Sequence, residues 1–218
     1  MTPRAFSKGE AIRFGWETAK RNFWFFFLIY CVYFVVAFVP PRLVPPGRTP
    51  FEILLTLGIS IAVGVLSIVT ALGLVRVGLR FTDNEKPSVA DLFSANFGQV
   101  LSFFVAFILS AIVTGIGFVL LVIPGIILGI RLSLVTYVIV DKKLGPVAAL
   151  RESWELTRGS AWNLSLFSIL LLLINALGAL ALVIGLLWTG PTSLVANAFV
   201  YRKLQAARGA RAAAPILG

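Results

Sequence analysis

The chain has 218 residues, of which 59% are hydrophobic and 13% charged, and its mean hydropathy is +0.97. A water-soluble domain of this length cannot bury so much apolar surface, whereas a lipid bilayer accepts it. There is no histidine and a single cysteine, Cys31, which excludes an intrachain disulfide, the usual zinc and haem sites, and histidine-based catalysis. We therefore expect an all-α integral membrane protein without a metal, a cofactor or an enzymatic activity.

The first predicted element is an amphipathic helix that begins near Ser7. Ser7 and Glu10 have the spacing of a capping box, in which each side chain satisfies a free N–H group at the helix start. An apolar stripe follows at helical spacing: Ile12, Trp16, Ala19 and Phe23. Arg13, Glu17 and Lys20 form a polar flank. We predict that this helix lies in the headgroup plane, and the alternative is that it extends the first span into the cytoplasm.

Six apolar segments are predicted to cross the membrane. They are residues 23–39, 51–75, 100–123, 125–140, 162–185 and 191–204. Five prolines between residues 40 and 50 predict a stiff connector, and Pro124 with Gly125 predicts a turn between the third and fourth spans. The last segment gives only about 20 Å at about 1.5 Å per residue, so we expect it to be short or tilted. Residues 206–218 form a basic tail that we expect to be poorly ordered.

Several spans carry small or polar residues at helical spacing. Gly64 belongs to a small-residue face on the second span, and Gly125 and Gly129 form a G-x-x-x-G pattern on the fourth, where helices can approach closely. The polar stripes comprise Ser110, Thr114, Ser133, Thr136, Asn175, Ser193 and Asn197. These stripes are either helix-packing surfaces or the lining of a pathway. Because no Asp or Glu lies within a span, a proton-coupled carrier is disfavoured.

The polar segment at residues 141–162 repeats the N-terminal helix. Residues 11–20 and 149–158 share Ala, Arg, Trp and Glu at the same offsets. The matching positions are Arg13, Trp16 and Glu17 in the first copy and Arg151, Trp154 and Glu155 in the second, with Lys20 answering Arg158. Both helices are either interfacial anchors or a binding site for a cytoplasmic partner. A weaker third copy begins near Pro87.

The second copy also has its own local signals. Pro146 is suited to the first turn of a helix, where its missing N–H has no partner anyway, and Gly159 is a natural stop. Arg151 and Glu155 are spaced to pair at i, i+4. The chain therefore reads as one transmembrane domain, residues 1–205, with repeat-like units at about 7–75, 87–140 and 145–204. Each unit is an interfacial helix followed by a hairpin of two spans.

The basic residues sort to one side of this arrangement. Sixteen lie at the ends that we assign to the cytoplasm: Arg4, Lys8, Arg13, Lys20, Arg21, Arg76, Arg80, Lys86, Lys142, Lys143, Arg151, Arg158, Arg202, Lys203, Arg208 and Arg211. Arg42 and Arg48 lie on the other side, and Arg131 lies within a span. The positive-inside rule then places both termini in the cytoplasm. The net charge of +10 fits contact with anionic phospholipids, so a nucleic-acid partner is not needed.

One stretch carries a family resemblance. Residues 121–128 read L-V-I-P-G-I-I-L, and they are followed by Arg131, by Asp141 and by S-W-E-L-T-R-G at residues 153–159. This pattern resembles the membrane domain attached to some glycerophosphodiester phosphodiesterases, and related bacterial inner-membrane families of unknown function. It covers residues 115–165 well and the rest only as hydropathy. The resemblance implies a multi-pass bacterial inner-membrane protein but no activity, because the phosphodiesterase's metal-binding motifs are missing.

Arg131 is the one charged residue within a predicted span. It lies six residues beyond Gly125, about 9 Å of helix rise from the outer turn. Its candidate partners are Glu52 at the outer start of the second span, a lipid phosphate, or main-chain carbonyls together with Asn175. A charge at such a position indicates a functional site, and the alternative is that the side chain snorkels to the outer surface.

These observations favour a non-enzymatic membrane protein that binds lipid or organises a membrane complex. Its expected partners are the lipid bilayer with its anionic phospholipids and either a second copy of the chain or another membrane protein. The alternative is a transporter or channel for a small amphiphilic or anionic solute.

Overall fold

The computed structural model describes residues 6–38, 49–180 and 185–213, and this part of the chain contains helices and no strand. The elements are α1 (Lys8–Arg21), α2 (Phe23–Phe38), α4 (Pro50–Thr82), the 3-10 helix η1 (Val89–Phe93), α5 (Phe97–Leu120), α6 (Val122–Leu132), α7 (Val135–Lys142), α8 (Pro146–Thr157), α9 (Ala161–Leu180) and α10 (Leu186–Ala213). The predicted all-α class is confirmed for the described residues. Most of the predicted proline-rich connector lies outside them.

Side chains at the helix ends explain several of these boundaries. The Ser7 hydroxyl accepts a hydrogen bond from a main-chain N–H in the first turn of α1 (3.5 Å). Thr49 and Glu52 form a reciprocal capping box at the start of α4. Pro146 occupies the first turn of α8, as predicted, and Gly159, with φ of 80°, lies between α8 and α9. The caps at Ser7 and Thr49 satisfy N–H groups that a helix start leaves without a partner.

Four helical stretches are long and apolar enough to cross a membrane: α4, α5, α9 and Pro124–Lys142, which spans most of α6 and α7. α1 and α2 would add a fifth together, but they are bent by 90° relative to each other. α10 is not among these stretches, so a sixth span stays a prediction. The predicted span at residues 125–140 is interrupted, because α6 ends at Leu132 and α7 begins at Val135.

The end of α10 differs from the sequence prediction. We expected a poorly ordered tail from residue 206, but α10 continues to Ala213. Alanine and arginine dominate this stretch, and both are strong helix formers, so the helix has no local reason to stop. Residues 214–218 lie outside the described part of the chain.

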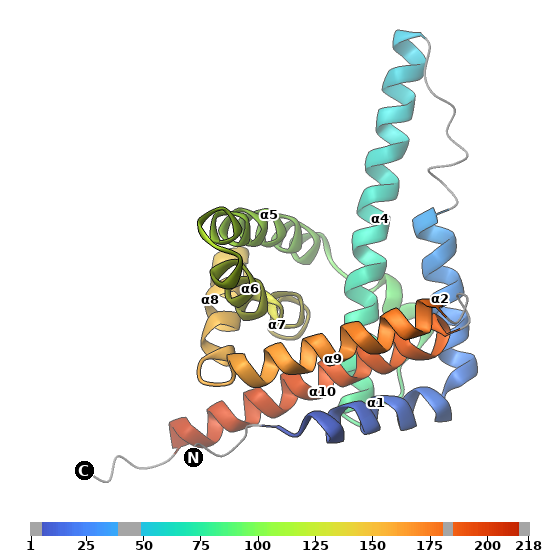
Figure 1. The fold of residues 1–218 in the computed structure, drawn as a ribbon. Helices are drawn as coiled ribbons and strands as arrows, with labels where there is room; N and C mark the ends of the chain where they lie inside the picture. The colour runs from blue at the N-terminus through green and yellow to red at the C-terminus, as the bar shows by residue number, and fades with distance from the viewer. Residues whose placement is uncertain (1–5, 39–48, 181–184, 214–218) are drawn as a thin grey trace.

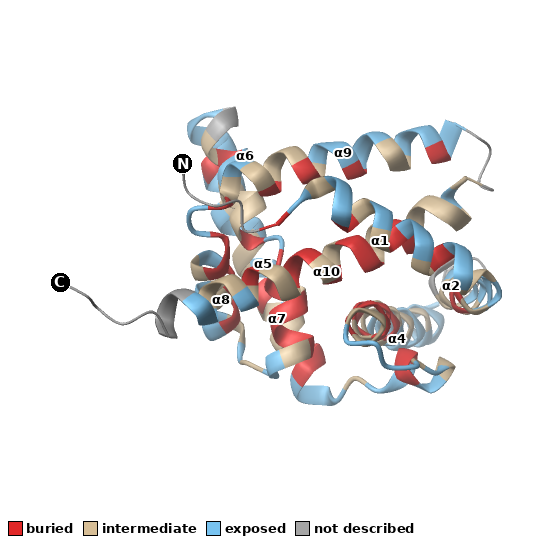
Figure 2. Ribbon diagram, turned by 90° about the horizontal axis from the view of Figure 1, so that it is seen from below, coloured by how far each residue is buried: buried red, intermediate tan, exposed pale blue. Residues whose placement is uncertain are grey.

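The helices run in two steeply crossed directions. α1, α9 and α10 lie side by side, while α2 and α4 run across them, and the N-terminal half of α4 projects beyond the other elements (Figure 1). Viewed from below, α4 is seen nearly end-on and α10 lies between α1 and α7 (Figure 2). The predicted spans therefore do not share one axis in this structure.

The close packing of α1 on α10 corrects the predicted role of the α1 faces. Of the predicted apolar stripe, Ala19 is buried and Ile12 packs on the core, but Trp16 is exposed, and the other buried residues of α1 are Ala11 and Gly15. A Cβ atom on Gly15 would lie only 3.2 Å from the Ala196 Cβ on α10, so glycine is what permits the close approach. These small residues recur every fourth position, which is a pattern that brings helices together.

The contact between α1 and α10 also constrains the membrane arrangement. The two helices are antiparallel: the Trp16 ring lies 5.6 Å from the Trp188 ring, and Lys203 pairs with Glu10 at 3.2 Å. We had placed Trp16 on the cytoplasmic side and Trp188 at the outer end of a hairpin. Because helices packed along their lengths share one orientation, α1 cannot lie in the headgroup plane while α10 crosses the bilayer.

α10 forms the centre of the core. Val195, Ala196, Ala198, Val200 and Tyr201 are all fully buried, so the middle of α10 is covered on nearly every side. Figure 2 shows buried residues along α10 and α7, and others in the C-terminal half of α4. A helix that is covered on all sides belongs to the interior of the protein. The charged residues that follow the buried part of α10 therefore lie close to neighbouring helices.

Candidate functional site

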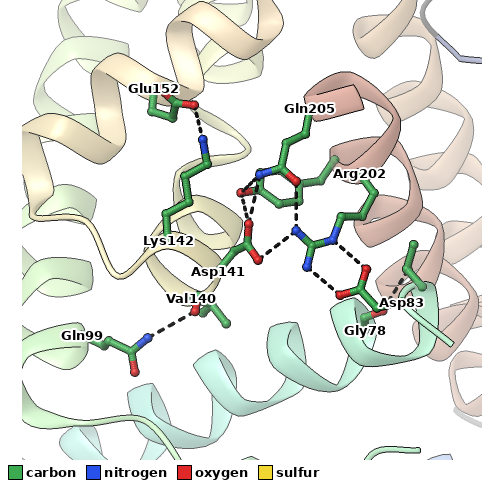
Figure 3. Close-up of polar contacts among 11 residues, drawn as sticks. Gly78, Asp83, Gln99, Val140, Asp141, Lys142, Glu152, Arg202 and Gln205 are labelled. Carbon is green, nitrogen blue, oxygen red and sulfur yellow. Dashed lines mark hydrogen bonds and ion pairs between the residues drawn. The ribbon is translucent and has the colours of Figure 1, made fainter. Parts of the chain in front are cut away.

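Ion pairs join four helices, α4, α7, α8 and α10, that are far apart in the sequence. We call Asp83, Asp141, Lys142, Glu152, Arg202 and Arg208 the charged junction. At its centre the Arg202 guanidinium on α10 donates two hydrogen bonds to Asp83, which follows α4, at 2.9 and 2.6 Å (Figure 3). The same guanidinium pairs with Asp141, in the last turn of α7, at 2.8 Å. One arginine thus connects three helices through charge-assisted hydrogen bonds, the strongest type in proteins.

Neutral side chains complete the hydrogen bonding of Asp141. The Tyr201 hydroxyl donates to the Asp141 Oδ2 atom at 2.9 Å, and the Gln205 Nε2 atom donates to the same oxygen at 3.0 Å (Figure 3). The Gln205 carbonyl in turn accepts a hydrogen bond from Arg202 at 2.9 Å. A charge that is largely removed from water is stable only when it is paired and hydrogen-bonded, and Asp141 meets both conditions.

A second set of contacts attaches α8 to the charged junction. Glu152 on α8 accepts hydrogen bonds or ion pairs from Lys142 at 2.6 Å and from Arg208 at 2.7 Å. Burial alone would raise the pKa of Glu152, but the hydrogen bonds from Lys142 and Arg208 outweigh it and lower that pKa. Arg208 also pairs with Glu155, and the predicted pair between Arg151 and Glu155 is confirmed at 3.4 Å.

Arg131 has very different surroundings. It lies in the last turn of α6, and its guanidinium carbon is 4.3 Å from the centre of the Trp154 ring on α8. The Arg131 Nε atom is buried and has no hydrogen-bond partner, and no described carboxylate pairs with the side chain. The main chain, in contrast, is satisfied, because the Ser153 hydroxyl donates to the Arg131 carbonyl at 2.7 Å. The cation is therefore held in place without being neutralised.

The other residues predicted to accompany Arg131 lie elsewhere. Glu52 caps the start of α4, at the end that projects away from α6 (Figure 1). Asn175 on α9 donates to the Leu171 carbonyl at 2.8 Å and to the Ser193 hydroxyl on α10 at 2.7 Å. The structure does not bring these residues together with Arg131: Glu52 caps α4, and Asn175 joins α9 to α10. Their part in a lipid site stays a prediction.

The contact with Trp154 limits the alternative in which the Arg131 side chain snorkels to the outer surface. That alternative was combined with a cytoplasmic position for α8. Because the guanidinium rests on the Trp154 ring, Arg131 and α8 share one depth, and the two assignments cannot both hold.

The remaining predicted residues occupy simple packing or surface positions. Gly125 is buried, and a Cβ atom there would lie 2.5 Å from the Phe118 ring of α5. A Cβ atom on Gly129 would lie 3.5 Å from the Thr114 methyl group of α5, and Pro124 lies in the first turn of α6. Gly64 has no neighbouring atom within 4 Å of a Cβ position, so it packs against no described helix.

On the two repeated helices, the predicted residues Arg13, Glu17 and Arg158 lie at the surface. Arg13 donates to Glu17 at 2.7 Å, and both side chains are exposed. Arg158 is exposed just after the end of α8.

The described residues contain no group of three or more His, Cys, Asp or Glu side chains placed to hold a metal ion. No protein-family model, curated protein or solved structure matches the sequence. The resemblance to the phosphodiesterase-associated membrane domain therefore stays a prediction that rests on residues 115–165.

The sequence interpretation missed the charged junction, although two signals pointed to it. Asp83 and Asp141 each follow directly after a long apolar segment, and acidic residues are scarce in this chain. Arg202 was counted only among the basic residues that we assigned to the cytoplasm. An acidic residue at the ends of two separate helices is a reason to look for a basic residue on a third.

Proposed function

We propose that this chain is a non-enzymatic integral protein of the bacterial cytoplasmic membrane that binds an anionic lipid headgroup at Arg131. A single observation supports the proposal: the Arg131 guanidinium stacks on Trp154 and has no described carboxylate partner. Arg131 lies within a stretch that is apolar enough to cross a membrane. The strong sorting of the other basic residues supports an orientation with both termini in the cytoplasm.

Energetics favour a ligand over an unoccupied arginine. An arginine at the centre of a membrane helix costs about 2.5–3.5 kcal/mol on insertion scales. Stacking on a tryptophan offsets about 0.5–2 kcal/mol of this cost, and the larger value applies to a site without water. The hydrogen bonds that the guanidinium still lacks are those that a phosphate accepts, since its oxygens match the planar donors of arginine. An anionic headgroup therefore supplies the hydrogen-bond acceptors that the described residues do not.

Native mass spectrometry of the full chain, released from a mild detergent, tests this proposal. Arg131→Gln removes the charge with little loss of volume, and we expect it to lose one retained anionic phospholipid. Arg151→Gln is the matched control, because Arg151 is 83% exposed and pairs only with Glu155 on its own helix. Equal retention of anionic lipid by the wild type and Arg131→Gln would reject the proposed site.

A further inference from the structure

An open groove of about 520 Å³ lies between α2 and the start of α10. Its walls include Phe27, Tyr30, Cys31, Phe34, Leu187 and Gly190. No charged side chain of the described chain lines this groove. A hollow of this size and composition is within the range of sites that bind small apolar molecules, about 300–1,000 Å³.

The floor of the groove depends on a glycine. A Cβ atom on Gly190 would lie 3.1 Å from the Tyr30 hydroxyl, so the missing side chain lets the Tyr30 ring rest directly on α10. The space above this contact is left open, with Cys31 exposed on the α2 side.

One end of the groove adjoins a cluster of tryptophans. Leu187 is followed directly by Trp188, whose ring stacks on Phe23 at 4.7 Å and contacts Trp16 at 5.6 Å. On the α2 side, the Phe27 ring lies 6.1 Å from Trp24. Tryptophan concentrates at the level of lipid headgroups, where its ring is apolar and its N–H is wet. The groove therefore begins at an amphipathic aromatic rim and continues along an apolar wall.

We infer that this groove binds a single acyl chain of a membrane phospholipid, with the headgroup at the tryptophan rim. The wall from Phe27 to Val35 is about 12 Å long at about 1.5 Å per residue. A hydrocarbon chain needs no hydrogen-bond partner on this apolar wall, and it leaves its polar head where the aromatic rings are.

The single cysteine of the chain provides a direct test. In detergent-solubilised protein, the rate of Cys31 alkylation by a maleimide is measured with and without added lysophosphatidylglycerol, which carries one acyl chain. At a lipid concentration about ten times its Kd, roughly a tenth of the grooves stay open, so we expect alkylation to slow about tenfold. Glycerol phosphate, which lacks the chain, is expected to leave the rate unchanged.

A matched control uses Leu172 on α9, which is 68% exposed and lies outside the groove. The thiol of the Leu172→Cys variant, made in a Cys31→Ser background, is expected to react at the same rate with or without lipid. Equal slowing at both positions would overturn the inference, as would a Cys31 that reacts slowly even without lipid, since the chain's own residues would then cover the groove. Because the groove does not use Arg131, Arg131→Gln should leave Cys31 protection intact, which separates failure of this site from failure of the headgroup site.

Discussion

The charged junction and the site around Arg131 surround an arginine in opposite ways. Arg202 lies between Asp83 and Asp141 and also donates to Gln205, so its donors have acceptors within the protein. Arg131 has an aromatic ring on one face and a buried Nε atom without an acceptor. The comparison shows that carboxylates of this protein pair with an arginine where that arginine joins helices. No described carboxylate pairs with Arg131, and for this reason we propose that an anionic ligand completes its surroundings.

The comparison is tested most strongly by Arg202→Met, which leaves two carboxylates facing each other at the junction. Breaking a buried ion pair costs about 3–5 kcal/mol, and the partial exposure of Arg202 reduces our expectation to about 2–3 kcal/mol of unfolding free energy. Chemical unfolding in detergent micelles measures this loss of unfolding free energy.

Lys203→Met is the control for Arg202→Met, because it removes the neighbouring charge from a more exposed pair with Glu10. Such surface pairs contribute about 0–1 kcal/mol. If the two variants were equally stable, the junction would not hold the helix ends together.

A smaller effect is expected from Tyr201→Phe, which removes one hydroxyl from the junction and keeps the ring. The hydroxyl donates to Asp141 at 2.9 Å and accepts from Gln205 at 2.8 Å, so its loss should cost about 1 kcal/mol. Tyr137→Phe is the matched comparison, because the Tyr137 hydroxyl makes only a 3.5 Å hydrogen bond to the Leu194 carbonyl. An equal or larger loss in Tyr137→Phe would contradict the assignment.

The two sites also differ in how far the sequence alone predicts their contacts. The apolar segments, the Pro146 helix start and the Arg151–Glu155 pair are local, because a helix brings residues four positions apart together. The bond between Arg202 and Asp83 joins residues 119 positions apart, and no local period encodes it. Arg131 was found because a charge in an apolar segment is conspicuous without any knowledge of its neighbours.

The helix arrangement was harder to predict for a related reason. In a membrane protein, both lipid-facing and protein-facing residues are apolar, so hydropathy does not say which faces meet. Ala11, Gly15 and Ala19 looked like part of a surface helix, yet they form the face that packs on α10. Small residues at four-residue spacing were the better guide, although Gly64 shows that such a residue does not always meet a helix of the same chain.

Acid should weaken the junction through Glu152. Its pKa is held below the ordinary value of 4.5, so the folded carboxylate contributes stability at pH values above 4.5 and loses it as pH falls through the lowered pKa. Unfolding free energy measured between about pH 6 and pH 3 should therefore fall more steeply in the wild type than in Glu152→Gln. Glu17→Gln, at an exposed pair on α1, is expected to keep the wild-type pH profile. Identical slopes in the wild type and Glu152→Gln would show that Lys142 and Arg208 do not stabilise this carboxylate.

The smallest change in intrinsic stability is expected for Arg131→Gln in lipid-free detergent. The variant loses a cation–π contact of about 0.5–1 kcal/mol but also removes an uncompensated charge, so the two effects largely cancel. Added phosphatidylglycerol separates the variants: at ten times its Kd, a ligand that binds only the folded state adds about 1.4 kcal/mol to the wild type. Thermal unfolding across a lipid titration should raise the Tm of the wild type and of Arg202→Met by more than that of Arg131→Gln, which keeps only the groove between α2 and α10. If Arg131→Gln gained as much from the lipid as the wild type, Arg131 would be a packing residue, and its missing acceptors would have to be found within the chain.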